Sequence, residues 1–207
     1  MTDRLFFDEE THTYTLGDRV LPSVTEICAP LTAGKYAAAS SVVDYAAARG
    51  TRIHELCALF DMDAMPDEIE AECLPYVEAW AAFCRDWRPA WERIEWAACS
   101  TVDGYAGTAD RIGLIDGKRC VVDIKTAASL DRASKVALCC QLQGYRSMAQ
   151  ENGLKMDGED LGVQLKKDGS YTVHMKSKIE QRYGFDAWHL WKYLVEIRAA
   201  VKGEKYV

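Results

Sequence analysis

Apolar and polar residues alternate over positions 5–27, at the start of the chain. Alternation with a period of two is typical of half-buried β-strands, and the pair Gly17-Asp18 within it favours a tight turn. Ser23 stands three residues before Glu26, which is the spacing of a capping box at the beginning of a helix. This segment therefore predicts a small β-hairpin that leads into a helix.

Two helical patterns follow the hairpin. An alanine-rich segment over residues 36–62 predicts a helix, with an interruption at Gly50 because glycine weakens a helix interior. A second helix is expected over residues 68–86, where large apolar residues recur at helical spacing. The first part of the chain is therefore predicted to be mostly helical.

The pattern changes after Pro89, where β-branched and aromatic residues become frequent. Such residues favour strands. The segments concerned predict strands over residues 92–100, 104–115 and 118–126, then a helix over 132–151, a hairpin of strands 161–167 and 170–176, and a helix over 179–201.

These elements predict one α/β (α+β) domain over residues 1–207, with a mixed central β-sheet flanked by helices. Residues 1–88 would form an N-terminal hairpin and a helical elaboration, and residues 89–207 would form the core. A chain of 207 residues, of which 49% are hydrophobic, is long enough to bury such a core.

The sequence offers no segment typical of a membrane protein. No apolar run approaches the roughly 20 residues that span a bilayer, and the N-terminus lacks the basic and apolar regions of a signal peptide. We therefore expect a cytoplasmic protein with no membrane partner. None of the eight cysteines forms a C-x2-C pair, a pattern that disfavours zinc and favours reduced thiols in the core.

The formal net charge of −7 is unevenly distributed. Residues 61–99 contain ten of the 32 acidic residues but only three of the 25 basic ones, so the remainder of the chain is neutral overall. Surfaces outside this segment are thus free to attract phosphate. The basic residues late in the chain are Lys166, Lys167, Lys176, Lys178 and Arg182. An ordinary solvated surface explains the same residues equally well.

The predicted hairpin over residues 107–126 carries the strongest chemical signal. Asp116-Gly117 is a typical two-residue turn, and a turn there places Asp110 directly opposite Asp123. Residues paired in this way have Cβ atoms roughly 4.5–5.5 Å apart, so two carboxylates would repel each other. The predicted pairing therefore calls for a cation or for a raised pKa.

Lys125 would share a face with Asp123, because alternate residues of a strand point the same way. Two carboxylates and an ammonium group suit metal-assisted hydrolysis of a phosphodiester, with Mg²⁺ as the ion and Mn²⁺ as a substitute. The alternative is a surface hairpin with an ordinary Lys–Asp ion pair. The register, the turn and the apolar neighbours favour a metal site.

Several short motifs occur in order along the chain. They are Thr13-Tyr14 with residues 22–25, residues 50–54 with the pattern G-x-x-x-H, Gly107-Thr108-Ala109-Asp110, Asp123-Ile124-Lys125-Thr126, and Gln141 with Tyr145. Together they resemble the RecB-like branch of the PD-(D/E)XK nuclease superfamily. The opening motif is similar to phage-encoded exonucleases and to the mitochondrial genome maintenance exonuclease. The resemblance extends over about residues 12–145.

The resemblance implies a restriction-endonuclease-like core and a role for each matched residue. Asp110, Asp123 and the carbonyl of Ile124 would bind the metal, and Lys125 would act on the attacking water. The chain departs from the superfamily pattern in two ways: the proline before the first Asp is absent, and the second acid is Asp rather than Glu. Neither departure removes a ligand of the implied metal site.

Further roles are implied outside the hairpin. His54 would bind or position a second metal ion, and Glu95 on the first core strand would correspond to an acidic metal-binding position. Gln141 and Tyr145 would brace the site or contact the DNA backbone. The Fe–S cluster of some relatives is not expected, because no cysteine follows Cys140.

Three of these residues also have structural interpretations. His54 flanks the apolar stripe of its helix, a position where histidines are commonly structural, although the nearby Gly50 would allow a close approach of backbone or ligand. Gln141 and Tyr145 share a helix face with apolar neighbours, so a packed amphipathic helix explains them without a function.

The sequence as a whole predicts a Mg²⁺-dependent DNA nuclease, in particular an exonuclease of recombination, repair or phage DNA processing. Its partner would be single-stranded DNA or duplex ends, and a phage or bacterial recombination protein is a candidate partner. The alternatives are a structure-specific or restriction-like endonuclease and a catalytically silent nuclease-like DNA-binding module. The oligomeric state stays open.

Overall fold

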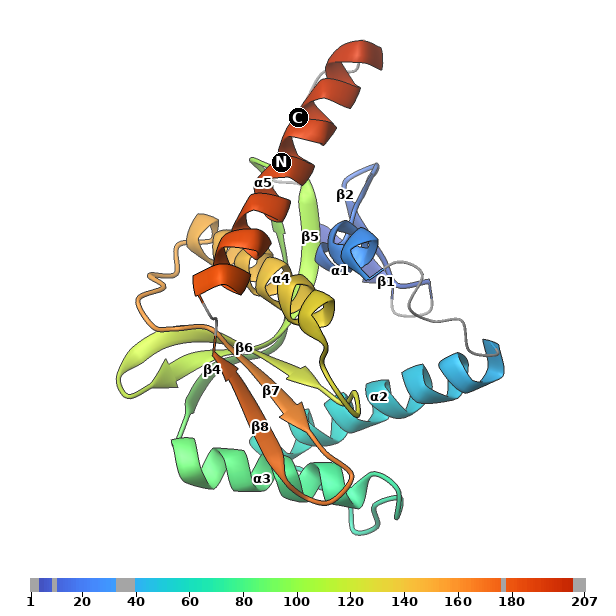
Figure 1. Cartoon of the computed structure of the whole chain (residues 1–207), viewed down its shortest axis with the longest axis vertical. Helices are drawn as coiled ribbons and strands as arrows, with labels where there is room; N and C mark the ends of the chain where they lie inside the picture. Colours follow the sequence, from blue (N-terminus) through green and yellow to red (C-terminus); the bar gives the residue numbers. More distant parts are fainter. Residues whose placement is uncertain (1–3, 9–10, 33–39, 176–177, 203–207) are drawn as a thin grey trace.

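The computed structural model describes residues 4–8, 11–32, 40–175 and 178–202, and it contains two sheets (Figure 1). The smaller, antiparallel sheet is formed by β1 (Leu5–Asp8), β2 (Thr13–Leu16) and β3 (Arg19–Leu21). The larger sheet has the order β4 (Ala90–Ser100), β5 (Tyr105–Ile115), β6 (Lys118–Lys125), β7 (Leu161–Leu165) and β8 (Tyr171–Met175). The helices are α1 (Val24–Cys28), the short 3-10 helix η1 (Ala29–Leu31), α2 (Ser40–Asp61), α3 (Leu74–Trp87), α4 (Arg132–Glu151) and α5 (Lys178–Lys202).

The larger sheet is mixed and has helices on both faces, as predicted. Its neighbouring strands are antiparallel except for β6 and β7, which run parallel and are joined through α4. Helices α4 and α5 cover one face, whereas α2 and α3 cover the other (Figure 1). Each face has its own hydrophobic cluster, the first around Tyr105, Leu142 and Trp188 and the second around Leu56 and Trp80.

The N-terminal segment forms three strands instead of the predicted two-stranded hairpin. β2 and β3 flank the expected turn at Gly17-Asp18, and β1 adds a third strand by pairing Leu5 with Leu16. The predicted capping box is confirmed: the hydroxyl of Ser23 accepts from the Glu26 amide at 3.1 Å, and the Glu26 carboxylate accepts from the Ser23 amide at 2.7 Å.

The boundaries of two predicted helices differ from the structure. α2 continues through Gly50, so the predicted interruption is wrong. The cost of an interior glycine, about 1 kcal/mol, is outweighed because Ile53 and Leu56 next to it are fully buried. The predicted positions 36–39 lie outside the described residues. α3 begins at Leu74 rather than at residue 68, with Pro75 in its first turn, where the missing amide costs nothing.

Two further predictions can be compared with the described residues. All eight cysteines are free thiols and six of them are buried, which confirms their assignment to the core. Within the described ranges, no helix has the length and apolarity needed to cross a bilayer.

Candidate metal centre

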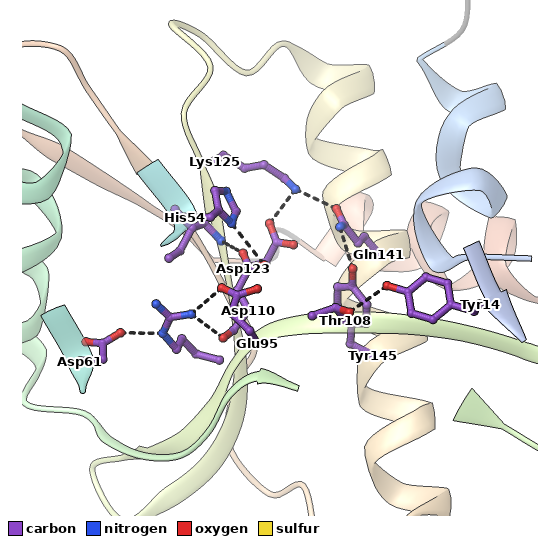
Figure 2. Close-up of polar contacts among 12 residues, drawn as sticks. Tyr14, His54, Asp61, Glu95, Thr108, Asp110, Asp123, Lys125, Gln141 and Tyr145 are labelled. Carbon is purple, nitrogen blue, oxygen red and sulfur yellow. Dashed lines mark hydrogen bonds and ion pairs between the residues drawn. The ribbon is translucent and has the colours of Figure 1, made fainter. Parts of the chain in front are cut away.

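The β5–β6 hairpin has the predicted register. The turn pairs Ile115 with Lys118, and the ladder continues to the pair of Arg111 and Val122. One step further along the same register, the Asp110 carboxylate accepts a hydrogen bond from the Ile124 amide at 2.6 Å. Asp110 and Asp123 are both buried and belong to one polar cluster (Figure 2). The hairpin therefore brings the two acids together, as the turn predicted.

Lys125 connects this cluster to α4. Its Nζ atom lies 2.7 Å from Asp123 Oδ2 and donates a hydrogen bond to Gln141 Oε1 at 2.8 Å. Gln141 in turn donates to the Tyr145 hydroxyl at 3.1 Å (Figure 2). Among the described residues, the Lys125 ammonium is the one group that forms an ion pair or hydrogen bond with the Asp123 carboxylate, which can accept several. Asp123 thus retains acceptor capacity.

A second group of ligands lies beside the hairpin acids. One side-chain atom each of His54 on α2, Glu95 on β4 and Asp110 on β5 lie within 4.8 Å of one another. His54 Nδ1 is 3.4 Å from Asp110 Oδ1. The structure therefore groups Glu95 more closely with Asp110 and His54 than the position of Glu95 in the sequence suggested.

The backbone of Glu95 adopts an unusual conformation for a strand. Its φ angle is +45°, in the left-handed region that costs an L-residue roughly 1–2 kcal/mol. The neighbouring ladder pairs, Ile94 with Arg111 and Trp96 with Ala109, place Glu95 in register with Asp110. Strain of this kind is concentrated at functional sites, where the surrounding structure maintains it.

Arg111 is the main residue that sequence reasoning missed. It is fully buried, donates to Asp61 at 2.6 Å and to Glu95 at 2.9 Å, and lies 5.5 Å from the centre of the Trp80 ring. A charged residue at a core-facing position of an apolar strand is the sequence signal that could have identified it. Asp61 is one of the ten acidic residues of the segment 61–99, and it pairs with Arg111 in the interior.

Burial and repulsion among the acids raise the pKa of two of the carboxyl groups. Burial raises the pKa of Asp123 to about 6; the Lys125 ammonium opposes this effect and the Asp110 charge adds to it. Burial and the Asp110 charge also raise the pKa of Glu95 to about 7. Two of the three carboxylates therefore hold protons more tightly than free side chains do.

The basic residues show the complementary effect. Burial alone would lower the pKa of His54, but the charge and hydrogen bond of Asp110, together with the charges of Glu95 and Asp123, raise it. Burial likewise opposes protonation of Lys125, but the charges of Asp123 and Asp110 raise its pKa. Burial alone would raise the pKa of Asp110, but the charge and hydrogen bond of His54, the Lys125 charge and the Ile124 amide together lower it. In the metal-free cluster, Asp110 is thus the best stabilised carboxylate.

The cluster opens into a cleft of about 890 Å³. All the predicted site residues line it, together with residues of the N-terminal sheet: His54, Glu95, Asp110, Asp123, Ile124, Lys125, Gln141, Tyr145, Phe7, His12 and Tyr14. Gly107 makes part of this arrangement possible, since a Cβ atom at this position would lie 2.9 Å from the Tyr145 ring.

The basic residues predicted to attract phosphate lie elsewhere. Lys166 and Lys167 are at the β7–β8 turn, and Arg182 on α5 pairs with Asp186 at 3.7 Å. None of these three lines the cleft. Lys176 is outside the described residues, as is the side chain of Lys178. The positive charge next to the acids comes instead from Lys125 and Arg111.

No protein-family model matches the chain, and no curated protein matches it. The assignment of a function therefore depends on the chemistry of the cleft.

Proposed function

We propose that this chain is a Mg²⁺-dependent nuclease with a restriction-endonuclease-like core, which hydrolyses phosphodiester bonds of DNA. One observation carries the proposal: three adjacent strands each contribute a carboxylate, Glu95, Asp110 and Asp123, to one cleft that also holds the ammonium group of Lys125. A structural role alone would not favour three acids in one cleft when the charge of Asp110 helps to raise the pKa of the other two.

The donor set fits a hard divalent cation. Carboxylate oxygens are the preferred protein ligands of Mg²⁺ and Mn²⁺. The Asp123 carboxylate, whose partner among the described residues is Lys125 alone, has acceptor sites left for an ion. Glu95, Asp110, Asp123 and the carbonyl of Ile124 would hold the ion, and His54 would contribute once it has lost its proton. The bound ion would polarise the phosphoryl oxygen and lower the pKa of a water molecule.

The residues of the chain would supply the remaining parts of the reaction. Lys125 would orient the attacking water and stabilise negative charge that develops on the phosphate. Gln141 and Tyr145 hold Lys125 through consecutive hydrogen bonds, which fix its direction. Arg111 holds Glu95 from the buried side. Lys125 is therefore the residue whose loss should affect chemistry more than metal binding.

Within this proposal, the chain is an exonuclease that acts on DNA ends or single strands in recombination, repair or phage DNA processing. The experiment incubates the purified full chain with end-labelled linear DNA and with covalently closed circular DNA, with Mg²⁺, with Mn²⁺ and with EDTA. Cleavage of linear DNA alone is expected, and it should require the metal. Cleavage of circular DNA would indicate an endonuclease instead.

Matched variants separate the site from the rest of the hairpin. Asp110→Asn and Lys125→Met should abolish cleavage, whereas Asp116→Asn in the turn and Lys118→Met at the other end of β6 should retain it. If both site variants cleave as fast as the wild type, the proposed site is wrong. If the wild type binds DNA without cleaving it under any of these conditions, the chain is a binding module.

A further inference from the structure

The cleft also has an aromatic part, or aromatic wall, formed by Phe7 of β1, by His12 directly before β2 and by Tyr14 of β2. The Phe7 and Tyr14 rings are stacked with centroids 4.4 Å apart, and the His12 ring meets the Phe7 ring edge-on at 5.1 Å. All three residues line the same cleft as the acids. An aromatic wall of this kind has no function in metal binding.

Tyr14 fixes this wall relative to the acids. Its side chain is buried, with 2% of its surface exposed, and its hydroxyl lies 2.8 Å from Thr108 Oγ1 (Figure 2). Thr108 precedes Asp110 by two residues in β5, so both side chains point to the same face of the sheet. The N-terminal sheet is also attached to β5 by a backbone hydrogen bond from Ala106 to Pro22 at 3.0 Å. The wall is therefore positioned by the strand that carries Asp110.

The exposed member of the wall is His12. It has a φ angle of +53°, and its side chain is exposed rather than packed in the core. Phe7 is half-buried and packs against the small cluster around Tyr14, Leu16 and Leu21. Together the two rings present an aromatic surface to the cleft.

The size of the cleft indicates that a phosphate and an ion would not fill it. At about 890 Å³, it lies in the upper part of the roughly 300–1,000 Å³ range of pockets that enclose drug-sized ligands. A nucleotide unit carries a flat aromatic base next to its phosphate, and stacking of bases on aromatic side chains tolerates any sequence. An aromatic wall beside a phosphate site thus matches the chemistry of one nucleotide unit.

On the basis of the proposed function, we propose that Phe7 and His12 form a platform for one unpaired nucleobase, which stacks on one ring and meets the other edge-on. The platform lies next to the phosphate that a metal ion at Asp110 and Asp123 would hold. A base in duplex DNA is already stacked and paired, so only a single-stranded segment or a frayed end can occupy the platform. The platform thereby defines the substrate class as single-stranded DNA or opened ends. The acids act on the backbone, and the platform positions the strand.

The test measures binding of the full-length chain to a fluorescein-labelled oligothymidylate by fluorescence anisotropy. Ca²⁺ replaces Mg²⁺, because carboxylates also bind Ca²⁺, and a gel verifies that the oligonucleotide stays intact. His12→Ala and Phe7→Leu should weaken binding roughly five- to hundredfold, in proportion to the stacking that is lost. Phe7→Leu keeps the apolar packing and removes only the ring. The matched control is Phe6→Ala, because Phe6 is 63% exposed and lies on the opposite face of β1.

A series of oligonucleotides with one abasic nucleotide adds a readout that a folding defect does not imitate. In the wild type, removal of one base at a single position should weaken binding as much as Phe7→Leu does. In Phe7→Leu, the same abasic nucleotide should cause no further loss, because the base and the ring act as one contact. Equal sensitivity to the abasic nucleotide in both proteins overturns the inference, as does an oligonucleotide affinity that Phe7 and His12 do not affect.

These measurements distinguish a failure of the platform from a failure of the proposed nuclease function. Base-dependent binding without hydrolysis in Mg²⁺ would support the platform and refute the nuclease. Hydrolysis that is insensitive to Phe7→Leu, His12→Ala and the abasic nucleotide would support the nuclease and refute the platform. Absence of any binding to the single strand also overturns the platform.

Discussion

Two buried aspartates, Asp123 in β6 and Asp160 directly before β7, show how a structural ion pair differs from a candidate site. Asp160 is fully buried and accepts from both ends of the Arg146 guanidinium at 2.7 and 2.8 Å and from the Val121 amide at 3.0 Å. Asp123 is equally buried, but among the described residues its carboxylate has a single ammonium group, that of Lys125, as its partner.

The surroundings of the two aspartates differ in the same sense. Arg146 also donates to the carbonyls of Met156 and Gly158, so both partners of the Asp160 pair are saturated by the fold. Asp123 lies beside Asp110 instead, and this proximity adds to the raised pKa of Asp123. A buried carboxylate with complete hydrogen bonding stabilises the fold, whereas one with remaining acceptor capacity and acidic neighbours is suited to a cation.

The largest expected difference is a separation of activity from stability. Asp123→Asn should lower hydrolysis by about a thousandfold, because a ligand that contributes several kcal/mol to charge stabilisation is lost. Asp160→Asn should instead lower the free energy of unfolding by about 3–5 kcal/mol, because it leaves the Arg146 charge buried without its partner. Single-turnover cleavage and urea denaturation measure the two quantities.

The comparison fails if Asp123→Asn and Asp160→Asn change the cleavage rate and the free energy of unfolding in the same way. A strongly destabilised Asp123→Asn with a normal rate per folded molecule would make Asp123 a structural residue. A folded Asp160→Asn without activity would place Asp160 in the site. Arg146→Met serves as the partner control and should reproduce the Asp160→Asn effect on unfolding.

The next effect is a dependence of stability on pH in the absence of metal. The folded pKa of Asp123, about 6, is above the ordinary value of 3.8 for an aspartate, so folding favours the protonated form. The corresponding stabilisation is fully present below about pH 4 and is lost as the pH rises through 6, by roughly 3 kcal/mol in total. Glu95 acts in the same direction up to about pH 7, but more weakly because its side chain is 38% exposed.

Denaturation of the wild type and of Asp123→Asn in EDTA over pH 4–8 isolates the contribution of Asp123. As the pH rises from 4 to 6, the free energy of unfolding of the wild type should fall relative to that of Asp123→Asn. Saturating Mg²⁺ should reduce this shift, because the ion neutralises the acids in place of protons. A difference that does not change with pH would show that Asp123 is not perturbed by its neighbours.

Most of the fold and the centre of the site could be predicted because both depend on local patterns. The boundaries of α4 and the register of the β5–β6 hairpin follow from helical periodicity and from the turn at Asp116-Gly117, which act over short stretches of chain. The continuity of α2 through Gly50 could not be predicted in this way, because burial against the sheet decides it. That burial is a tertiary contact, which the local sequence pattern does not show.

The environment of Glu95 lay beyond prediction for the same reason. Its partner Arg111 follows 16 residues later, and Asp61 precedes Arg111 by 50 residues, so the network exists only after the sheet and α2 have packed. The positive φ angle of Glu95 is likewise invisible to a pattern of strand residues. Tertiary contacts therefore determine which acids join the hairpin pair.

A smaller effect is expected from the metal itself. Mg²⁺ or Mn²⁺ at about ten times its dissociation constant should stabilise the wild type by about 1.4 kcal/mol, which corresponds to a rise in melting temperature of roughly 3–6 °C. Differential scanning fluorimetry measures this rise. It should disappear in Asp110→Asn and persist in Asp116→Asn, and an equal rise in both would place the ion elsewhere.

The smallest effect concerns the backbone at Glu95. Glycine at an ordinary strand position is less stable than alanine by about 0.5–1 kcal/mol, but at a φ of +45° alanine must bear the steric cost that glycine avoids. Glu95→Gly should therefore be more stable than Glu95→Ala by about 1 kcal/mol, although both lose the carboxylate and its contact with Arg111. At the nearby exposed residue Arg93, the usual order of stability should hold, so that Arg93→Ala is more stable than Arg93→Gly. Urea denaturation of the four variants tests this, and the same order at both positions would show that Glu95 is unstrained. Both Glu95 variants should lose hydrolysis to the same extent, because the strain belongs to the backbone and the chemistry to the carboxylate that it directs into the cleft.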